Sequence, residues 1–298
     1  SSSFFATLQA IKARPDVIHY HAEGPCVMLR LAHWAGIRTV ATIHGLDWQR
    51  AKWGKFASTY LKLGERTAAT CADEVIVLSR NMQEYFKNAY GRDTRFIPNG
   101  IAAKEIMPVD RINAMFGLVK DGYFLFLGRI VPEKGVHYLI EAFHRVHTDK
   151  KLVIAGGSSD SSDYQQRIQV MAESDPRIVL TGFVQGRLLQ ELFSNAYAYV
   201  MPSDLEGMPM SLLEAMAYGN CCLTSDIPEC TEVVEDKALA FPHGSVDDLA
   251  GTLQQMADDS AMVAWYRREA AGFITGKYSW DRVVDQTLAL YAGDKDGE

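Results

Sequence analysis

The sequence predicts an α/β protein that contains two doubly wound parallel sheets. Short apolar runs rich in Val, Ile and Tyr alternate with longer segments of helical spacing, which is the pattern of parallel strands joined by crossover helices. The alternation forms two series, and the stretch NGIAAKEIMPVDRINAMFG between them interrupts it and carries Pro108. The chain has 298 residues, 48% of them hydrophobic, which is enough for two domains that each bury a core.

Ten runs are predicted to be strands. The first series consists of DVIHYH (16–21), IRTVATIH (37–44), EVIVLS (74–79) and TRFIPN (94–99). The second consists of YFLFLG (123–128), KLVIAGG (151–157), RIVLTG (177–182), AYVMPS (198–203), CCLTSD (221–226) and ALAFP (238–242). The Ser- and Asp-rich segment GGSSDSSD (156–163) suits a helix start, and WDRVVDQTLALY near the end is an amphipathic helix. The predicted divisions are residues 1–104, 105–276 and 277–298.

Composition excludes several classes of protein. No stretch approaches the roughly 18 uninterrupted apolar residues of a membrane span, and no basic start with an apolar core resembles a signal peptide. The five cysteines form no Cys-x-x-Cys pair and sit mostly inside apolar runs, which favours reduced thiols, a cytoplasmic location and no zinc site. The net charge of -7 argues against nucleic acid as a partner.

The segment EGMPMSLLEAMAYG (206–219) directly follows a predicted strand and reads as a helix start. Pro209 suits the first turn of a helix, and Gly219 suits its end. The backbone amides of Met210, Ser211 and Leu212 are then expected to point at a phosphate or diphosphate, because unpaired N–H groups and the helix dipole attract an anion. Glu206 and Glu214 flank this helix start and are expected to accept hydrogen bonds from hydroxyls of a sugar and a ribose.

The segment GRIVPEKG (128–135) follows the first strand of the second series and supplies two cations. Arg129 and Lys134 there could hold a diphosphate and stabilise the charge that it gains as a leaving group. Each of these side chains alone is more often a solvated surface charge. Together with the two glutamates and the helix start, they indicate a nucleotide-diphosphate site.

With these motifs the chain resembles the retaining glycosyltransferases of family 4, which have the GT-B fold of two facing Rossmann-like domains. In the family's signature, seven residues separate two glutamates, and Glu206 and Glu214 match these two positions. The family's Arg and Lys pair matches Arg129 and Lys134. Its His-Gly loop matches His44 and Gly45. The resemblance covers nearly the whole chain. The stretch HGLDWQRAKWGKFASTYLKLGER also resembles bacterial members that build cell-surface polysaccharides.

The resemblance implies a role for each matched residue. Arg129 and Lys134 would contact the diphosphate, Glu206 and His44 the donor sugar, Glu214 the ribose, and the segment at Phe183 and Val184 the base. The closing helix would return to the first domain. The residues assigned to nucleotide-sugar binding are therefore Glu214, Gly207, Met208, Met210, Ser211, Leu212, Gly156, Phe183 and Val184, beside a catalytic set of Arg129, Lys134, Glu206 and His44.

The implied reaction moves a sugar from a nucleotide-diphosphate donor to a glycan or lipid-linked acceptor, with retention by front-side attack. The Asp-x-Asp pattern occurs only at Asp294 and Asp296 in the polar tail, so neither a metal ion nor another cofactor is expected. Two alternatives stay open. One is a catalytically inactive nucleotide-sugar-binding subunit or fragment, and the other is a GT-B sugar-nucleotide epimerase or a related glycan phosphorylase.

Two further expectations concern the first series of strands. The segment 48–66 interleaves basic and aromatic residues, which suits either peripheral contact with an anionic membrane at the cytoplasmic face or an ordinary amphipathic helix. The first strand also matches the middle of the family's first domain. We therefore expect that domain to be incomplete, with residues 105–276 binding nucleotide and residues 1–104 only marginally ordered alone.

Overall fold

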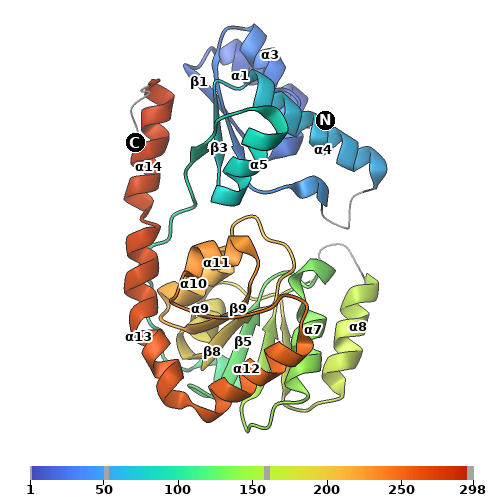
Figure 1. The fold of residues 1–298 in the computed structure, drawn as a ribbon, viewed down its shortest axis with the longest axis vertical. Coiled ribbons are helices and arrows are strands. Elements are labelled where there is room, and N and C mark those ends of the chain that lie inside the picture. Colours follow the sequence, from blue (N-terminus) through green and yellow to red (C-terminus); the bar gives the residue numbers. More distant parts are fainter. Residues whose placement is uncertain (1, 50–53, 158–161, 294–298) are drawn as a thin grey trace. The chain divides into compact units, whose positions relative to one another are not determined.

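The computed structural model describes residues 2–49, 54–157 and 162–293, and it divides into two compact units (Figure 1). The first unit comprises Ser1–Gly100 with Trp280–Glu298, and the second comprises Ile101–Ser279. The divisions expected from the sequence, after residues 104 and 276, lie within a few residues of these.

The first unit contains a parallel sheet of four strands in the order β1-β2-β3-β4. His21, the last residue of β1, lies opposite Thr42 near the end of β2. Because neighbouring parallel strands end at the same edge, the segments that follow β1 and β2 lie side by side. The strands are β1 (Val17–His21), β2 (Arg38–Ile43), β3 (Glu74–Val77) and β4 (Arg95–Phe96).

Helices cover both faces of this sheet. Successive side chains of a strand point to opposite faces. Accordingly, Ala41 and Ile43 join one apolar cluster, whereas Val40 joins a second cluster with Leu290 of the last helix. The last helix of the chain thus packs on the sheet of the first unit. The helices are α1 (Ser2–Ala13), α2 (Glu23–Cys26), α3 (Leu29–Trp34), η1 (Asp47–Gln49), α4 (Lys55–Cys71), α5 (Arg80–Tyr90) and α14 (Trp280–Ala292).

The second unit contains a parallel sheet of six strands in the order β10-β9-β8-β5-β6-β7. The chain runs outward from β5 through β6 to β7, and then returns to place β8 on the other side of β5. The strand order therefore reverses between β5 and β8, and open α/β sheets bind ligands beyond the carboxyl ends of strands at such a point. The strands are β5 (Tyr123–Leu127), β6 (Lys151–Ala155), β7 (Ile178–Gly182), β8 (Ala198–Met201), β9 (Cys221–Ser225) and β10 (Leu239–Phe241).

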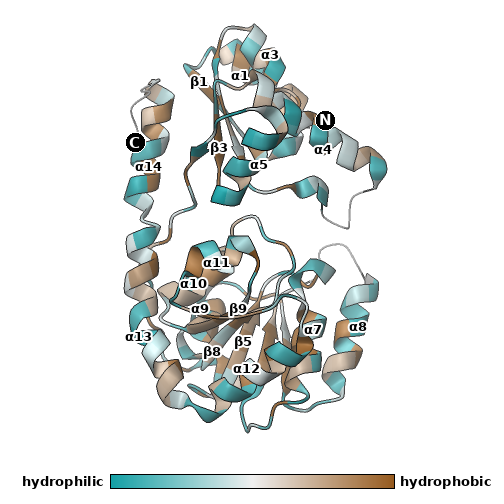
Figure 2. Cartoon of the chain, viewed as in Figure 1, coloured by the Kyte–Doolittle hydropathy of each residue, from teal (hydrophilic) through white to brown (hydrophobic). Residues whose placement is uncertain are grey.

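Two apolar layers enclose this second sheet, and Figure 2 shows its strands as the most hydrophobic part of the unit. Leu125 and Val153 join the layer under one set of helices, and Phe124 and Leu152 join the other, as the alternation of strand side chains requires. The helices are α6 (Arg111–Phe116), η2 (Pro132–Lys134), α7 (Val136–Phe143), α8 (Ser162–Glu173), α9 (Gly186–Asn195), α10 (Met210–Ala217), α11 (Pro228–Val234), α12 (Val246–Asp258) and α13 (Ser260–Lys277).

The α/β class and the two parallel sheets predicted from the sequence are confirmed, since each of the ten predicted runs contains one of the ten strands found in the described residues. The helix start expected in GGSSDSSD falls largely on residues 158–161, which lie outside the described residues, and α8 begins at Ser162. In the described parts of the chain, no helix combines the length and the apolar character that crossing a bilayer requires.

Candidate active site

The sequence-predicted residues of the second unit gather at the carboxyl ends of its central strands. Arg129 and Lys134 lie in the connection after β5, Gly156 follows β6, Phe183 follows β7, and Glu206 follows β8. Because all of these strands are parallel neighbours, their following loops share one edge of the sheet. This edge includes the point where the strand order reverses.

Two glycines let the loops after β5 and β6 approach each other closely. Gly156 has a φ of 151°, and a Cβ atom there would lie 1.8 Å from the carbonyl oxygen of Gly128. Its N–H donates to the carbonyl oxygen of Gly182 at 2.9 Å, which ties the loop after β6 to the end of β7. A larger residue at position 156 would therefore force these loops apart.

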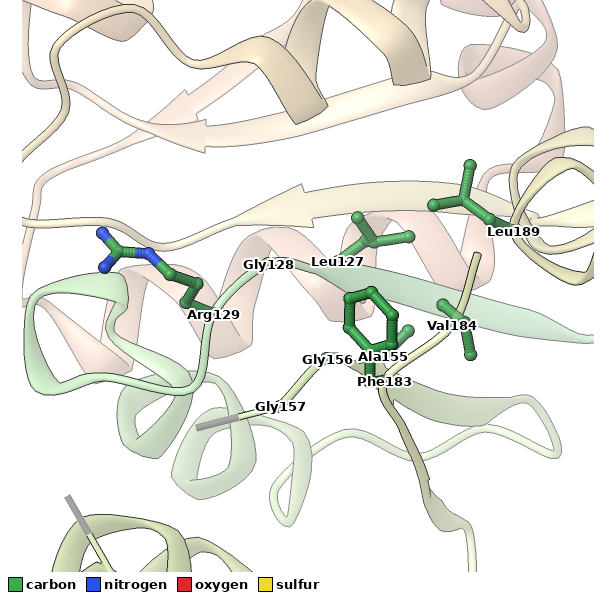
Figure 3. Close-up of a pocket in the computed structure, with 9 residues that line it drawn as sticks. All are labelled: Leu127, Gly128, Arg129, Ala155, Gly156, Gly157, Phe183, Val184 and Leu189. Carbon is green, nitrogen blue, oxygen red and sulfur yellow. The ribbon is translucent and has the colours of Figure 1, made fainter. Parts of the chain in front are cut away.

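A cavity of about 480 Å³ opens beside these glycines (Figure 3). The Arg129 guanidinium lies on one side of it, and the side chains of Val184 and Leu189 lie on the other. The ring of Phe183 is 75% exposed and forms part of the wall, so a flat aromatic surface is open to a ligand. The lining residues are Leu127, Gly128, Arg129, Ala155, Gly156, Gly157, Phe183, Val184 and Leu189.

Lys134, which lies in the same connection after β5 as Arg129, forms a largely buried ion pair with Glu206. The Lys134 Nζ lies 2.5 Å from Oε1 of Glu206, and the two side chains are only 16% and 7% exposed. The hydroxyl of Ser203 donates to the same carboxylate oxygen at 2.7 Å. A paired and hydrogen-bonded carboxylate is held in one place, so the ammonium of Lys134 is held in one place as well.

Backbone contacts fix the two loops that carry this pair. The N–H of Asp204 donates to the carbonyl oxygen of Glu133 at 2.9 Å. Gly135 has a φ of 65°, and a Cβ atom there would lie 1.9 Å from the carbonyl oxygen of Pro202. The ion pair therefore rests on a close backbone approach that only glycine permits.

The start of α10 corrects one prediction. The N–H of Met210 donates to the carbonyl oxygen of Met208, and the N–H of Leu212 donates to the carbonyl oxygen of Pro209, both at 2.9 Å. These two amides are therefore not free to bind an anion. Pro209, with φ -78° and ψ 78°, directly precedes the helix in the geometry of an inverse γ-turn, which closes the Met210 bond. The hydroxyl of Ser211 is also engaged, because it accepts a hydrogen bond from Tyr199 at 2.9 Å.

Glu214 lies inside α10, in a more open environment than Glu206. Its Oε1 is 3.5 Å from the Nζ of Lys104, and its side chain is 31% exposed. The Lys104 ammonium also lies 5.8 Å from the centre of the Tyr218 ring. Glu214 is thus an accessible acceptor with one loosely placed cation beside it.

His44 belongs to the first unit, directly after β2. Its Nε2 lies 3.2 Å from Nδ1 of His21, the last residue of β1. Burial lowers the pKa of His44, and the neighbouring His21 lowers it further, although Asp47 acts in the opposite direction. His44 is therefore a neutral imidazole at pH 7, able to donate one hydrogen bond and accept another.

The structure adds partners that the sequence analysis did not single out. Ser203 holds Glu206, Lys104 faces Glu214, and His21 holds His44. Of these three partners, only Ser203 could have been found from the sequence, since it ends a predicted strand three residues before Glu206. Among the described residues, no group of His, Cys, Asp or Glu has the geometry to hold a metal ion, and Asp294 and Asp296 lie outside those residues.

The fold and this edge of the second sheet define the class as a GT-B glycosyltransferase. Anabaena HepE in complex with UDP-glucose has a TM-score of 0.86 to this structure, at 18% sequence identity over 98% of this chain and 82% of that one. Residues 111–272 match the family described as glycosyl transferases group 1, and residues 2–105 match glycosyltransferase family 4. The chain belongs to the group 1 glycosyl transferases, as its sequence motifs predict.

Curated relatives of known activity share the family. An alpha-maltose-1-phosphate synthase of Mycobacterium tuberculosis is 28% identical over 281 residues, which is 85% of this chain and 72% of the relative. A UDP-Gal:alpha-D-GlcNAc-diphosphoundecaprenol alpha-1,3-galactosyltransferase of Escherichia coli is 26% identical over 268 residues, or 84% of this chain and 68% of the relative.

Proposed function

We propose that the chain transfers a sugar from a nucleotide-diphosphate sugar to a glycan or lipid-linked acceptor, with retention of configuration and without a metal ion. The observation that carries the proposal is the site after β5 and β8, where one connection carries both Arg129 of the cavity wall and Lys134 of the buried pair with Glu206. The names of the relatives agree with this choice, since HepE is described with UDP-glucose and the Escherichia coli enzyme with a UDP-Gal donor.

The cavity supplies the contacts that a nucleotide needs. The exposed ring of Phe183 and the apolar side chains of Val184 and Leu189 suit a base. Gly128 and Gly156 leave the backbone bare, so a diphosphate can approach it closely beside the Arg129 guanidinium. We assign the ribose to Glu214, whose carboxylate is accessible to hydroxyl donors.

The chemistry follows from the positions of the charges. As the bond between the sugar and the diphosphate breaks, negative charge grows on the leaving group, and Arg129 and Lys134 stabilise it as fixed donors. Their two charges do the work that a divalent cation would otherwise do. The acceptor oxygen forms the new glycosidic bond from the same face, and its proton passes to an oxygen of the departing diphosphate.

Glu206 fits the role of an anchor better than that of a nucleophile. Its Oε1 already accepts from Lys134 and Ser203, and a carboxylate held by two donors is a poor attacking group. We therefore assign Glu206 to holding Lys134 and binding the donor sugar. His44 is assigned to a hydrogen bond with a sugar hydroxyl.

Transfer assays with a panel of nucleotide sugars and glycan acceptors test this proposal. Arg129→Ala and Lys134→Ala should each lower kcat about 100- to 1,000-fold, which is the effect of losing one fixed charge donor. Arg268→Ala, which removes an exposed cation of α13, is the matched control and should keep full activity. EDTA should have no effect, and the product should keep the anomeric configuration of the donor.

Other outcomes would select the alternatives. Nucleotide-sugar binding without turnover on any acceptor would identify a binding subunit, and conversion of the nucleotide sugar into its epimer without acceptor would favour an epimerase. Activity lost to EDTA and restored by magnesium would contradict the metal-independent reaction, and inversion of the anomer would contradict retention.

An exposed face of α4 supports a lipid-linked acceptor at a membrane surface. Phe56 is 88% exposed and Leu63 is 46% exposed, and their spacing of seven residues places them on one side of the helix. Lys55, Lys62 and Arg66 flank them, while the part of the 48–66 segment at 50–53 lies outside the described residues. Apolar groups framed by cations suit an anionic bilayer.

Sedimentation with vesicles of anionic and of neutral lipid tests this surface. The chain should bind the anionic vesicles at low salt, and the double variant Lys55→Glu and Lys62→Glu should lose that binding. Exchange of the exposed Lys12 of α1 for Glu is the control. Absence of binding to anionic vesicles at low salt would reject the membrane contact.

A further inference from the structure

Three histidines gather at the carboxyl edge of the first sheet, and only His44 has a role in the proposed reaction. His19 and His21 point to the same face of β1, and their rings stack with centres 4.2 Å apart. The Nδ1 of His21 then lies 3.2 Å from the Nε2 of His44. These three rings do not form a metal site, since no group of metal-binding geometry occurs in the described chain.

His19 is the fixed base of this stack. Its Nδ1 lies 2.6 Å from the hydroxyl of Tyr291 on α14, and its Nε2 lies 2.7 Å from the hydroxyl of Thr42 on β2. Both ring nitrogens are therefore engaged, and the ring plane is held from two elements. His21 rests on this plane, so its own ring can face His44 in one orientation.

The backbone after His21 is strained in a way that supports this orientation. Ala22 has φ 67° and ψ 163°, a strained region that residues other than glycine almost never adopt. The N–H of Ala22 donates to the backbone carbonyl oxygen of Thr42 at 2.9 Å, and the next residue, Glu23, is fully buried. Surrounding packing thus enforces a sharp turn between the exposed His21 and the interior.

All three rings are neutral at pH 7. Burial lowers the pKa of each, and it lowers that of His19 to about 4 with help from His21 and His44. Asp47 of η1 is the charged group that raises the pKa of His44. A hydrogen bond between two neutral imidazoles uses the N–H of one ring and the lone pair of the other, so it ties the tautomer of one ring to that of the other.

We propose that His21 is a positioning residue for His44. By engaging the Nε2 of His44, it holds that ring's orientation, ties its tautomer to that of His21 and leaves Nδ1 as the nitrogen that meets a sugar hydroxyl. This inference rests on the proposed function, in which His44 contacts the sugar. His21 itself does not touch the substrate.

Imidazole nitrogen shifts measured by two-bond 1H–15N NMR at about pH 8, above the ordinary histidine pKa, test the positioning without any substrate. In the wild-type protein the Nε2 of His44 and the Nδ1 of His21 should form a complementary pair, one protonated and the other not, and His21→Ala should change the tautomer balance of His44. His21→Asn places an amide group, which can donate or accept, where Nδ1 stood, and it should return the His44 shifts toward those of wild type. Exchange of the exposed His33 of α3 for Ala is the control. Unchanged His44 shifts in His21→Ala would overturn the inference.

Kinetics then separate the positioning from the proposed function. His21→Ala should lower kcat about tenfold with a donor KM within about twofold of wild type, and His21→Asn should recover most of kcat. If the tautomer shifts as predicted but His44→Ala keeps full transfer activity, the role of His44 in the reaction is wrong and the catalytic part of the inference is overturned with it. A His21→Ala enzyme with wild-type kcat would also overturn it.

Discussion

Glu206 and Glu214 belong to one sequence signature but differ in their surroundings. Glu206 has a side chain only 7% exposed and shares one oxygen between Lys134 and Ser203. Glu214 is 31% exposed and has one ammonium at 3.5 Å. The first carboxylate therefore organises other groups, whereas the second is open to a ligand.

This difference predicts different kinetic effects. Glu214→Ala should raise the donor KM about tenfold with little change in kcat, because a ribose contact of about 1.4 kcal/mol is made equally in the ground and transition states. Glu206→Ala should lower kcat about 100-fold or more, because it leaves the buried Lys134 unpaired and misplaced. Steady-state kinetics with one donor measure both. Equal changes of kcat and KM in the two variants would contradict the distinction.

At the scale of single residues, the sequence predicts which residues lie together better than it predicts their hydrogen-bond and ion-pair partners. Arg129, Gly156, Phe183 and Val184 were selected from the sequence, and one cavity contains all of them. The partner of Glu214 could not be predicted, because Lys104 lies 110 residues away and has no pattern of its own. The prediction of free amides at Met210 and Leu212 was wrong, because both N–H groups donate to nearby carbonyl oxygens in the turn at Pro209 and in the first turn of α10.

Helices α2 and α4 meet around two buried carboxyl groups. Glu23 and Glu65 both have no exposed surface. Glu65 accepts hydrogen bonds from Trp48 at 2.9 Å, Tyr85 at 2.7 Å and Tyr90 at 2.5 Å. Burial raises the pKa of Glu23 to about 9, with further contributions from the neighbouring Glu65 carboxylate and Asp47. Glu23 thus keeps its proton at neutral pH.

This arrangement predicts how stability depends on pH. The folded protein holds a proton on Glu23 that the unfolded chain releases near pH 4.5, so the stabilisation is complete at low pH and is lost as pH rises toward 9. In wild type, the free energy of unfolding should fall between pH 6.5 and pH 8.5 by up to about 1.4 kcal/mol per pH unit relative to Glu23→Gln.

Chemical denaturation at several pH values across this window measures the effect. Glu23→Gln keeps the neutral shape and should flatten the pH dependence, whereas Glu84→Gln, on the exposed side of α5, should follow wild type. The buried thiols and the histidines are common to all three proteins and cancel in the comparison. Parallel curves for wild type and Glu23→Gln would show that Glu23 is ionised in the folded state.

The sequence predicts these elements but not what they bury. The segment 48–66 reads as a basic and aromatic face, yet the indole of Trp48 points to the buried Glu65, and only part of α4 is open to solvent. A glutamate between Gly64 and Arg66 in the sequence looks solvated. Its burial follows from the close contact of α4 with α2, where a Cβ atom at Gly64 would lie 1.8 Å from the carbonyl oxygen of Glu23.

For the whole molecule, alternation of strand and helix patterns predicted the class, but not the order of the strands. Apolar periodicity identifies a strand and says nothing of its neighbours. The order β10-β9-β8-β5-β6-β7 sets the reversal beside β5, and that reversal brings the loops at Arg129 and Glu206 together although 77 residues separate them. From the sequence, only the family signature predicted that these two loops lie together. The order of the strands in the sheet explains why they do.

Ligand-induced stabilisation tests most directly the claim that this edge holds a nucleotide-diphosphate sugar. The Tm of the intact chain is measured with UDP-, GDP-, ADP- and dTDP-sugars, for wild type, Arg129→Ala, Lys134→Ala and the control Arg268→Ala. At least one nucleotide sugar should raise the Tm of wild type and of the control, since a ligand at 100 times its Kd adds about 2.7 kcal/mol to the stability of the folded state. The same ligand should raise the Tm of Arg129→Ala and Lys134→Ala much less. No shift with any nucleotide sugar, or the same shift in all four proteins, would contradict the account.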